Sequence, residues 1–119
     1  MGTGRVMITI KKCSQADKEH SDSIRQYAHT FHYKNVICVA KAWRDLPIDH
    51  KMGIIAHEIG HLLMGNTDHS ESEANKAANK FFDIHIQHID SKYGKHLQCV
   101  SLEDTMNIWE WVYKNVKLT

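Results

Sequence analysis

The residues best suited to do chemistry lie in one short stretch, HEIGH, from His57 to His61. On an α-helix, residues i and i+4 share one face, so the two imidazole rings can direct nitrogen atoms at one ion. Imidazole nitrogen is a preferred ligand of Zn²⁺, and a catalytic zinc site has three protein ligands and one open position. The spacing therefore predicts that His57 and His61 bind zinc and that a third ligand lies elsewhere.

Glu58 is rotated by about 100° from His57 around such a helix, so it flanks the predicted metal. Zinc lowers the pKa of a bound water toward about 7 and polarises a carbonyl oxygen. A carboxylate beside it can take a proton from that water and deliver it to a leaving amine. The alternative interpretation of HEIGH is that His57 and His61 are core histidines that hydrogen-bond backbone carbonyls. We predict Glu58 to be catalytic and the reaction to be peptide-bond hydrolysis.

Four downstream residues could supply the third ligand, namely Asp68, His69, Glu71 and Glu73. On a helix beginning at Ser70, Glu71 lies about 130° from the middle of the polar face, and Glu73 lies about 70° from it. Glu71 therefore points toward the core and is the predicted ligand, with His69 and Glu73 as alternatives. Asn75, one turn after Glu71, is placed to hydrogen-bond a ligand histidine.

The extended metzincin pattern H-E-x-x-H-x-x-G-x-x-H fails, because Met64 and Thr67 stand where it needs glycine and histidine. HEIGH followed by E-S-E-A-N instead resembles the ImmA/IrrE family of gluzincin-like metallopeptidases, and the minimal gluzincins are a related comparison. That family carries H-E-x-x-H and then a helix reading E-x-E-A-N-x-F-A. Residues 54–82 carry the resemblance, and Ala77 departs from it where phenylalanine is usual. The resemblance implies a zincin-like fold, a zinc ligand at Glu71 and a DNA-binding repressor as a substrate.

Composition places the chain among ordinary globular proteins. It has 119 residues, 42% hydrophobic and 24% charged, with a net charge of +1. This predicts a single domain over residues 1–119 and does not favour nucleic-acid binding. Three widely spaced cysteines, no signal-peptide pattern and no apolar run of about 18 residues predict a cytoplasmic protein that does not enter a membrane.

Hydrophobic periodicity predicts an α+β fold with a small N-terminal sheet and mostly helices after it. The expected strands are residues 5–11 and 35–42, and the expected helices are residues 16–31, 52–64, 70–91 and one from Ser101. The helix over 52–64 is apolar all round and should be buried. Two histidines and a glutamate are costly to bury there unless a metal satisfies them.

Further residues have weaker expected roles. The strand over 35–42 would be an edge strand that aligns an extended substrate. Tyr93 or His96 would stabilise an oxyanion, and Cys13 could in principle block the zinc as a thiolate. His85 and His88 would pack against the core from the helix over 70–91. The last helix would bury a stripe formed by Leu102, Met106, Trp109, Val112 or Tyr113, and Val116.

Two functions follow from these residues. The first is a zinc-dependent metallopeptidase that acts on a separate protein or peptide, because the chain shows no obvious helix-turn-helix of its own. The second is a non-catalytic zinc-stabilised module that binds a partner protein, since structural metal adds stability to small domains. The fourth coordination position separates them, because water there indicates catalysis and a fourth protein ligand indicates structure.

Overall fold

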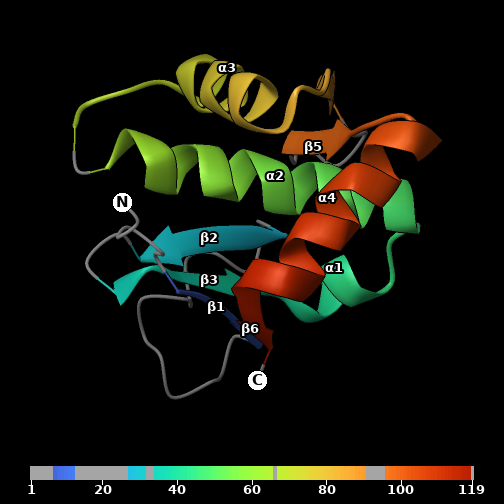
Figure 1. The fold of residues 1–119 in the computed structure, drawn as a ribbon, viewed down its shortest axis with the longest axis horizontal. Coiled ribbons are helices and arrows are strands. Elements are labelled where there is room, and N and C mark those ends of the chain that lie inside the picture. The colour runs from blue at the N-terminus through green and yellow to red at the C-terminus, as the bar shows by residue number, and fades with distance from the viewer. Residues whose placement is uncertain (1–6, 13–26, 32–33, 66, 91–95, 119) are drawn as a thin grey trace.

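The computed structural model describes residues 7–12, 27–31, 34–65, 67–90 and 96–118, except for the side chains of residues 88–90, 96, 97 and 118. These residues form an α+β fold with four helices, a four-stranded mixed sheet and a two-stranded sheet (Figure 1). In chain order the elements are β1 (Ile8–Lys12), β2 (Ala28–Phe31), β3 (Val36–Val39), α1 (Lys41–Arg44), α2 (Ile48–Met64), α3 (Glu71–Phe82), β4 (Gln87–Asp90), β5 (His96–Cys99), α4 (Leu102–Asn115) and β6 (Val116–Leu118).

The larger sheet has the strand order β2-β3-β1-β6. β1 runs parallel to both β3 and β6, and β2 runs antiparallel to β3. Along β1 the side chains alternate, so that Ile8 and Ile10 are buried and Thr9 is partly exposed. The strand predicted over residues 35–42 is confirmed as β3, which is shorter and covers Val36–Val39. Because β3 pairs on both sides, it cannot be the edge strand that we expected to align a substrate.

α2 is the central element of the fold. It packs against β2, β3, β5, α3 and α4, and Figure 1 shows it lying across the larger sheet with α3 on its other side. Every residue from Met52 to Gly60 is buried, as a helix apolar on all sides predicts. Gly65 ends the helix with a φ of 70°, which glycine adopts without strain. No helix in the described part of the chain is long and apolar enough to cross a membrane.

Two predicted helices differ from the structure. Ala28–Phe31 forms strand β2 rather than the end of a helix over 16–31, because its backbone pairs with β3. Residues 16–26 of that prediction lie outside the described residues. The helix predicted over 70–91 ends at Phe82, where Asp83 adopts the left-handed conformation with a φ of 55°. The chain then enters the antiparallel pair of β4 and β5.

The buried face of α4 also differs from the prediction. Ser101 caps the helix as expected, and its Oγ accepts a hydrogen bond of 3.1 Å from the Asp104 backbone N–H. The buried residues are Thr105, Ile108 and Val112, and the Thr105 hydroxyl is satisfied by a 2.8 Å bond to the Ser101 carbonyl. Of the predicted stripe, only Val112 is buried, and four members are exposed by 44% or more, namely Leu102, Met106, Trp109 and Tyr113.

Candidate metal centre

α2 places His57 and His61 at the side of the helix that faces α3, and Glu58 beside His57. His57 and Glu58 are buried, with 4% and 6% of their surface exposed, and His61 is partly buried. The centroids of the two imidazole rings are 4.6 Å apart, and their Nε2 atoms are 3.1 Å apart. The helix thus directs both Nε2 atoms toward one point, as the spacing of HEIGH predicts.

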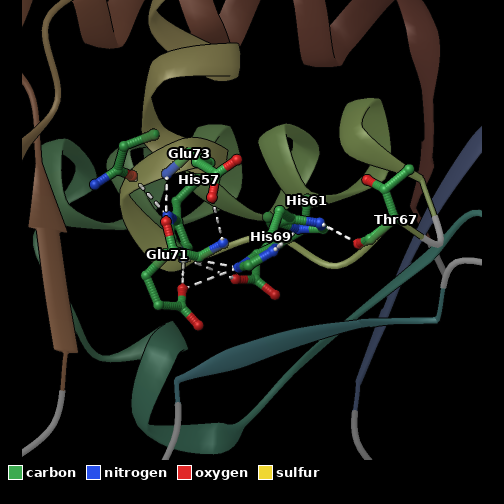
Figure 2. Close-up of polar contacts among 9 residues, drawn as sticks. His57, His61, Thr67, His69, Glu71 and Glu73 are labelled. Carbon is green, nitrogen blue, oxygen red and sulfur yellow. Dashed lines mark hydrogen bonds and ion pairs between the residues drawn. The ribbon is translucent and has the colours of Figure 1, made fainter.

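Glu71, the first residue of α3, completes this arrangement. Its Oε2 lies 2.6 Å from Nε2 of His57 and 2.9 Å from Nε2 of His61 (Figure 2). His57, His61 and Glu71 form a group whose ligand atoms lie within 4.8 Å of one another and that could hold a metal ion. The closeness of the two imidazole rings, which can donate to the Glu71 carboxylate when they are protonated, holds the pKa of Glu71 well below the usual range.

Glu73 has a different task at the start of α3. Ser70 Oγ accepts a bond from the Glu73 backbone N–H, and Glu73 Oε1 accepts one from the Ser70 backbone N–H, both at 3.1 Å. This capping box fixes where α3 begins and holds the Glu73 carboxylate at the helix end. Glu73 therefore does not join the metal-binding group, and neither does the exposed Asp68.

Gly60 allows α3 to approach α2 closely. A Cβ atom on Gly60 would lie 2.0 Å from the carbonyl oxygen of Ala74 and 2.8 Å from its carbonyl carbon. Only glycine fits such a backbone contact. The glycine inside HEIGH therefore positions the helix that carries Glu71.

The tautomer of His57 follows from Asn75. The Nδ1 atom of His57 lies 2.6 Å from Asn75 Oδ1. An amide oxygen only accepts hydrogen bonds, so Nδ1 carries the proton. In the neutral ring the lone pair is then on Nε2, which faces Glu71. Asn75 thus makes the contact with a candidate ligand histidine that the sequence predicts.

The tautomer of His61 follows from contacts with His69 and Thr67, which we did not predict from the sequence. His69 Nδ1 lies 2.7 Å from the Thr67 carbonyl oxygen, which can only accept, so His69 Nδ1 donates (Figure 2). In neutral His69, Nε2 is then the acceptor for His61 Nδ1 at 2.8 Å. The lone pair of neutral His61 is therefore on Nε2. His69 meets the far side of the His61 ring and is not a member of the metal-binding group.

These contacts bring three electron-rich atoms together, the two Nε2 lone pairs and a carboxylate oxygen. Such atoms repel one another unless a proton or a cation lies between them. Two histidines and a glutamate are a known donor set of catalytic zinc. Tetrahedral zinc with bonds of 2.0–2.1 Å holds its ligand atoms roughly 3.3 Å apart. The separations of 2.6, 2.9 and 3.1 Å must widen only slightly to accept it.

Glu58 borders the group without belonging to it. Its Oε2 lies 3.7 Å from His57 Nε2, and its side chain is 8% exposed. Burial raises the pKa of Glu58 to about 8, with the charge of His61 opposing this shift and that of Glu71 adding to it. A buried carboxyl with a pKa near neutrality, beside a metal-binding group, is suited to accept and release protons.

The remaining candidates are not part of this site or are not described. His85 lies beyond the end of α3 and is exposed, so the prediction that it packs in the core is wrong. Its backbone N–H donates a 3.1 Å bond to Asp104 Oδ2. Cys13 and Tyr93 lie outside the described residues, and so do the side chains of His88 and His96.

Comparison with known proteins yields no relative, because the chain matches no protein-family model, no curated protein and no solved structure. The chemistry of the site therefore rests on its own donor atoms and on the contacts that orient them.

Proposed function

We propose that this chain is a zinc-dependent metallopeptidase with a zincin-like fold, of the gluzincin type that the ImmA/IrrE family exemplifies. The observation that carries the proposal is the convergence of His57 Nε2, His61 Nε2 and Glu71 Oε2 within 3.1 Å of one another. The flanking contacts of Asn75 and His69 support it, because they leave the Nε2 lone pair of each neutral ring directed at this point.

When bound, zinc would supply a water molecule of lowered pKa and an electrophile for the scissile carbonyl. The carboxylate of Glu58 would accept the proton of the attacking water and hold it for the leaving amine. In the metal-free protein burial raises the pKa of Glu58 to about 8, and a dication bound beside it would lower that pKa toward the range in which the carboxylate accepts a proton.

The ligand count favours catalysis over a purely structural metal. Structural zinc sites are closed by four protein ligands, whereas catalytic sites keep one position open. Within the described part of the chain, three residues form the group, and no fourth histidine, cysteine or carboxylate joins them. His69, which the sequence offers as an alternative ligand, does not join the group, because its Nε2 contacts His61 Nδ1 instead.

The proposed substrate is a separate protein or peptide, with a DNA-binding repressor as the class that the family resemblance suggests. The test incubates purified zinc-loaded protein with candidate repressors and identifies the products by mass spectrometry. Glu58→Gln should abolish cleavage and retain the metal, because Glu58 is not in the ligand group. Glu73→Gln is the matched control and should cleave normally. Cleavage that survives Glu58→Gln or chelation would contradict the mechanism, and an inactive wild type that binds zinc through four ligands would favour a non-catalytic module.

A further inference from the structure

A second feature of the molecule lies on the opposite side of α2 from the metal centre. It is a cavity of about 340 Å³ bounded by β1, β3, α1, α4 and the first half of α2. Ile55 on its wall and His57 in the metal-binding group are two residues apart, which places them about 160° apart around the helix. The cavity is therefore separate from the site proposed for catalysis.

The interior of this cavity is apolar. Ile10, Val39, Met52, Ile55 and Val112 line it, and each is buried. Its volume is at the lower end of the range, about 300–1,000 Å³, that ligand sites occupy. An apolar wall of this extent offers no hydrogen bonds to a polar ligand, so the body of any occupant must be hydrocarbon.

Two indole rings, Trp43 and Trp109, also line the cavity, and Trp109 is 44% exposed. Trp43 is fixed, because its Nε1–H donates a 3.2 Å bond to the Lys51 carbonyl oxygen. The Lys51 ammonium lies 5.5 Å from the centroid of the same ring, at cation–π distance. One wall of the cavity is therefore the fixed Trp43 ring, with the Lys51 ammonium close to it.

The charged residues around the cavity are all of one sign. Lys12, Arg44 and Lys51 are among its lining residues, and none of the described lining residues is acidic. Lys12 and Arg44 are exposed, and within the described residues neither forms an ion pair. An arginine guanidinium can bind a carboxylate through two parallel hydrogen bonds. An apolar interior with cationic lining residues is complementary to an apolar molecule that carries one carboxylate.

We propose that this cavity binds an aliphatic monocarboxylate, with its hydrocarbon chain against the apolar wall and its carboxylate at Arg44 and Lys12. A neutral amide of the same chain length would lose the charged contact, and a cationic amphiphile would be repelled. The proposal does not depend on zinc, since no residue of the metal-binding group lines the cavity.

The test titrates decanoate, decanamide and decyltrimethylammonium into the full chain and follows the indole N–H signals by NMR. Trp43 and Trp109 should shift saturably with decanoate. Trp111 is an internal reference, because it packs against Phe81 and Phe82 and does not line the cavity. The Lys12→Ala/Arg44→Ala double variant should bind decanoate about tenfold or more weakly, as loss of a charged hydrogen bond implies. Lys76→Ala, an exposed lysine on α3, is the matched control and should bind like wild type.

Three outcomes would overturn the proposal. Equal shifts of all three indoles would indicate detergent-like binding. Equal affinity for decanoate and decanamide, or an unchanged decanoate affinity in the double variant, would show that Lys12 and Arg44 do not bind the carboxylate. Circular dichroism of each variant excludes unfolding as the cause. Titration of metal-free and zinc-loaded protein should give the same affinity, so failure of the metallopeptidase proposal would leave this result intact.

Discussion

The backbone of Gly60 in α2 packs against the carbonyl group of Ala74 in α3, which leaves no room for a side chain at position 60. A methyl group on position 60 would lie 2.0 Å from that oxygen, so the two helices would have to separate. Glu71 and Asn75 flank Ala74 in the same helix, and both contact His57. The distance between the helices thus determines the geometry of the candidate metal-binding group His57, His61 and Glu71.

The first prediction is that Gly60→Ala lowers both stability and zinc affinity. Alanine for glycine inside a helix normally stabilises it by about 1 kcal/mol, so the sign of the effect should reverse here. Urea unfolding and zinc competition with a chelator measure the two effects. Gly53→Ala is the matched control, because its Cβ would lie 2.8 Å from Cys99 Cα on β5. It should lose stability and keep its zinc affinity, whereas a stabilised Gly60→Ala variant with normal zinc binding would contradict the close contact.

The second prediction separates the two glutamates of α3. Glu71→Ala removes one of three donors, so zinc affinity should fall by far more than the 10- to 100-fold typical of residues that only orient a ligand. Glu73→Ala removes half of the capping box, so the free energy of unfolding should fall by about 1 kcal/mol while the site still fills. Metal analysis and urea unfolding of both variants test this. The reverse pattern would show that Glu73 is the ligand.

The third prediction concerns His69, whose Nε2 contacts Nδ1 of the candidate ligand His61. His69→Ala should weaken zinc binding about 10- to 100-fold, and Asn75→Ala should fall in the same range. His69→Gln should recover part of the loss, because an amide can accept from His61 Nδ1 and donate to the Thr67 carbonyl. Nitrogen-15 NMR of metal-free protein should show the His61 proton on Nδ1 in wild type. A His69→Ala variant as empty of zinc as Glu71→Ala would instead make His69 a ligand.

The fourth prediction is a pH dependence of the metal-free protein. The pKa of Glu58 is 4.5 when unfolded and about 8 when folded, so the folded state binds this proton more tightly. Its contribution to stability is complete below pH 4.5 and is lost as pH rises through about 8. Glu71 has the opposite effect on stability. Its pKa is lowered in the folded state, so its contribution to the free energy of unfolding is lost as the pH falls.

Glu58→Gln should therefore flatten the decline in stability between pH 4.5 and 8 and should be more stable than wild type at the upper end of that range. Urea unfolding in the presence of a chelator, repeated across this range, measures the difference. Parallel curves for the two proteins would show that Glu58 does not titrate as its burial implies.

The sequence predicts the grouping of the candidate metal ligands better than it predicts the fold, because these residues are close together in the chain. His57, His61, Glu71 and Asn75 lie on two consecutive helices, so helical periodicity alone places them relative to one another. The contact of His69 with His61 depends on the conformation of the turn before Ser70. Helical spacing carries no information about that turn, so the sequence left His69 as an alternative ligand.

The errors in the fold have identifiable physical causes. Ala28–Phe31 became a strand because tertiary pairing with β3 overrides local preference. The end of α3 was missed because Asp83 takes a left-handed conformation more typical of glycine or asparagine. The alternation from Ile84 to Gln87 was an available signal for the strand that follows. In α4 we chose large apolar residues for the core, whereas Thr105 can be buried because its hydroxyl bonds the preceding turn.

The pairing of Ile8 with Val116 joins segments near the two ends of the chain, whereas His57 and Glu71 are close in sequence. Contacts between distant segments form late in folding, because closing a long loop costs entropy before the contact stabilises it. We therefore expect α2 and α3 to pack together, and to bring His57 and Glu71 into contact, before β1 and β6 close the sheet. In pulse-labelled hydrogen exchange during refolding, the backbone amides of α2 and α3 should become protected before those of β1. Added zinc should not change that order.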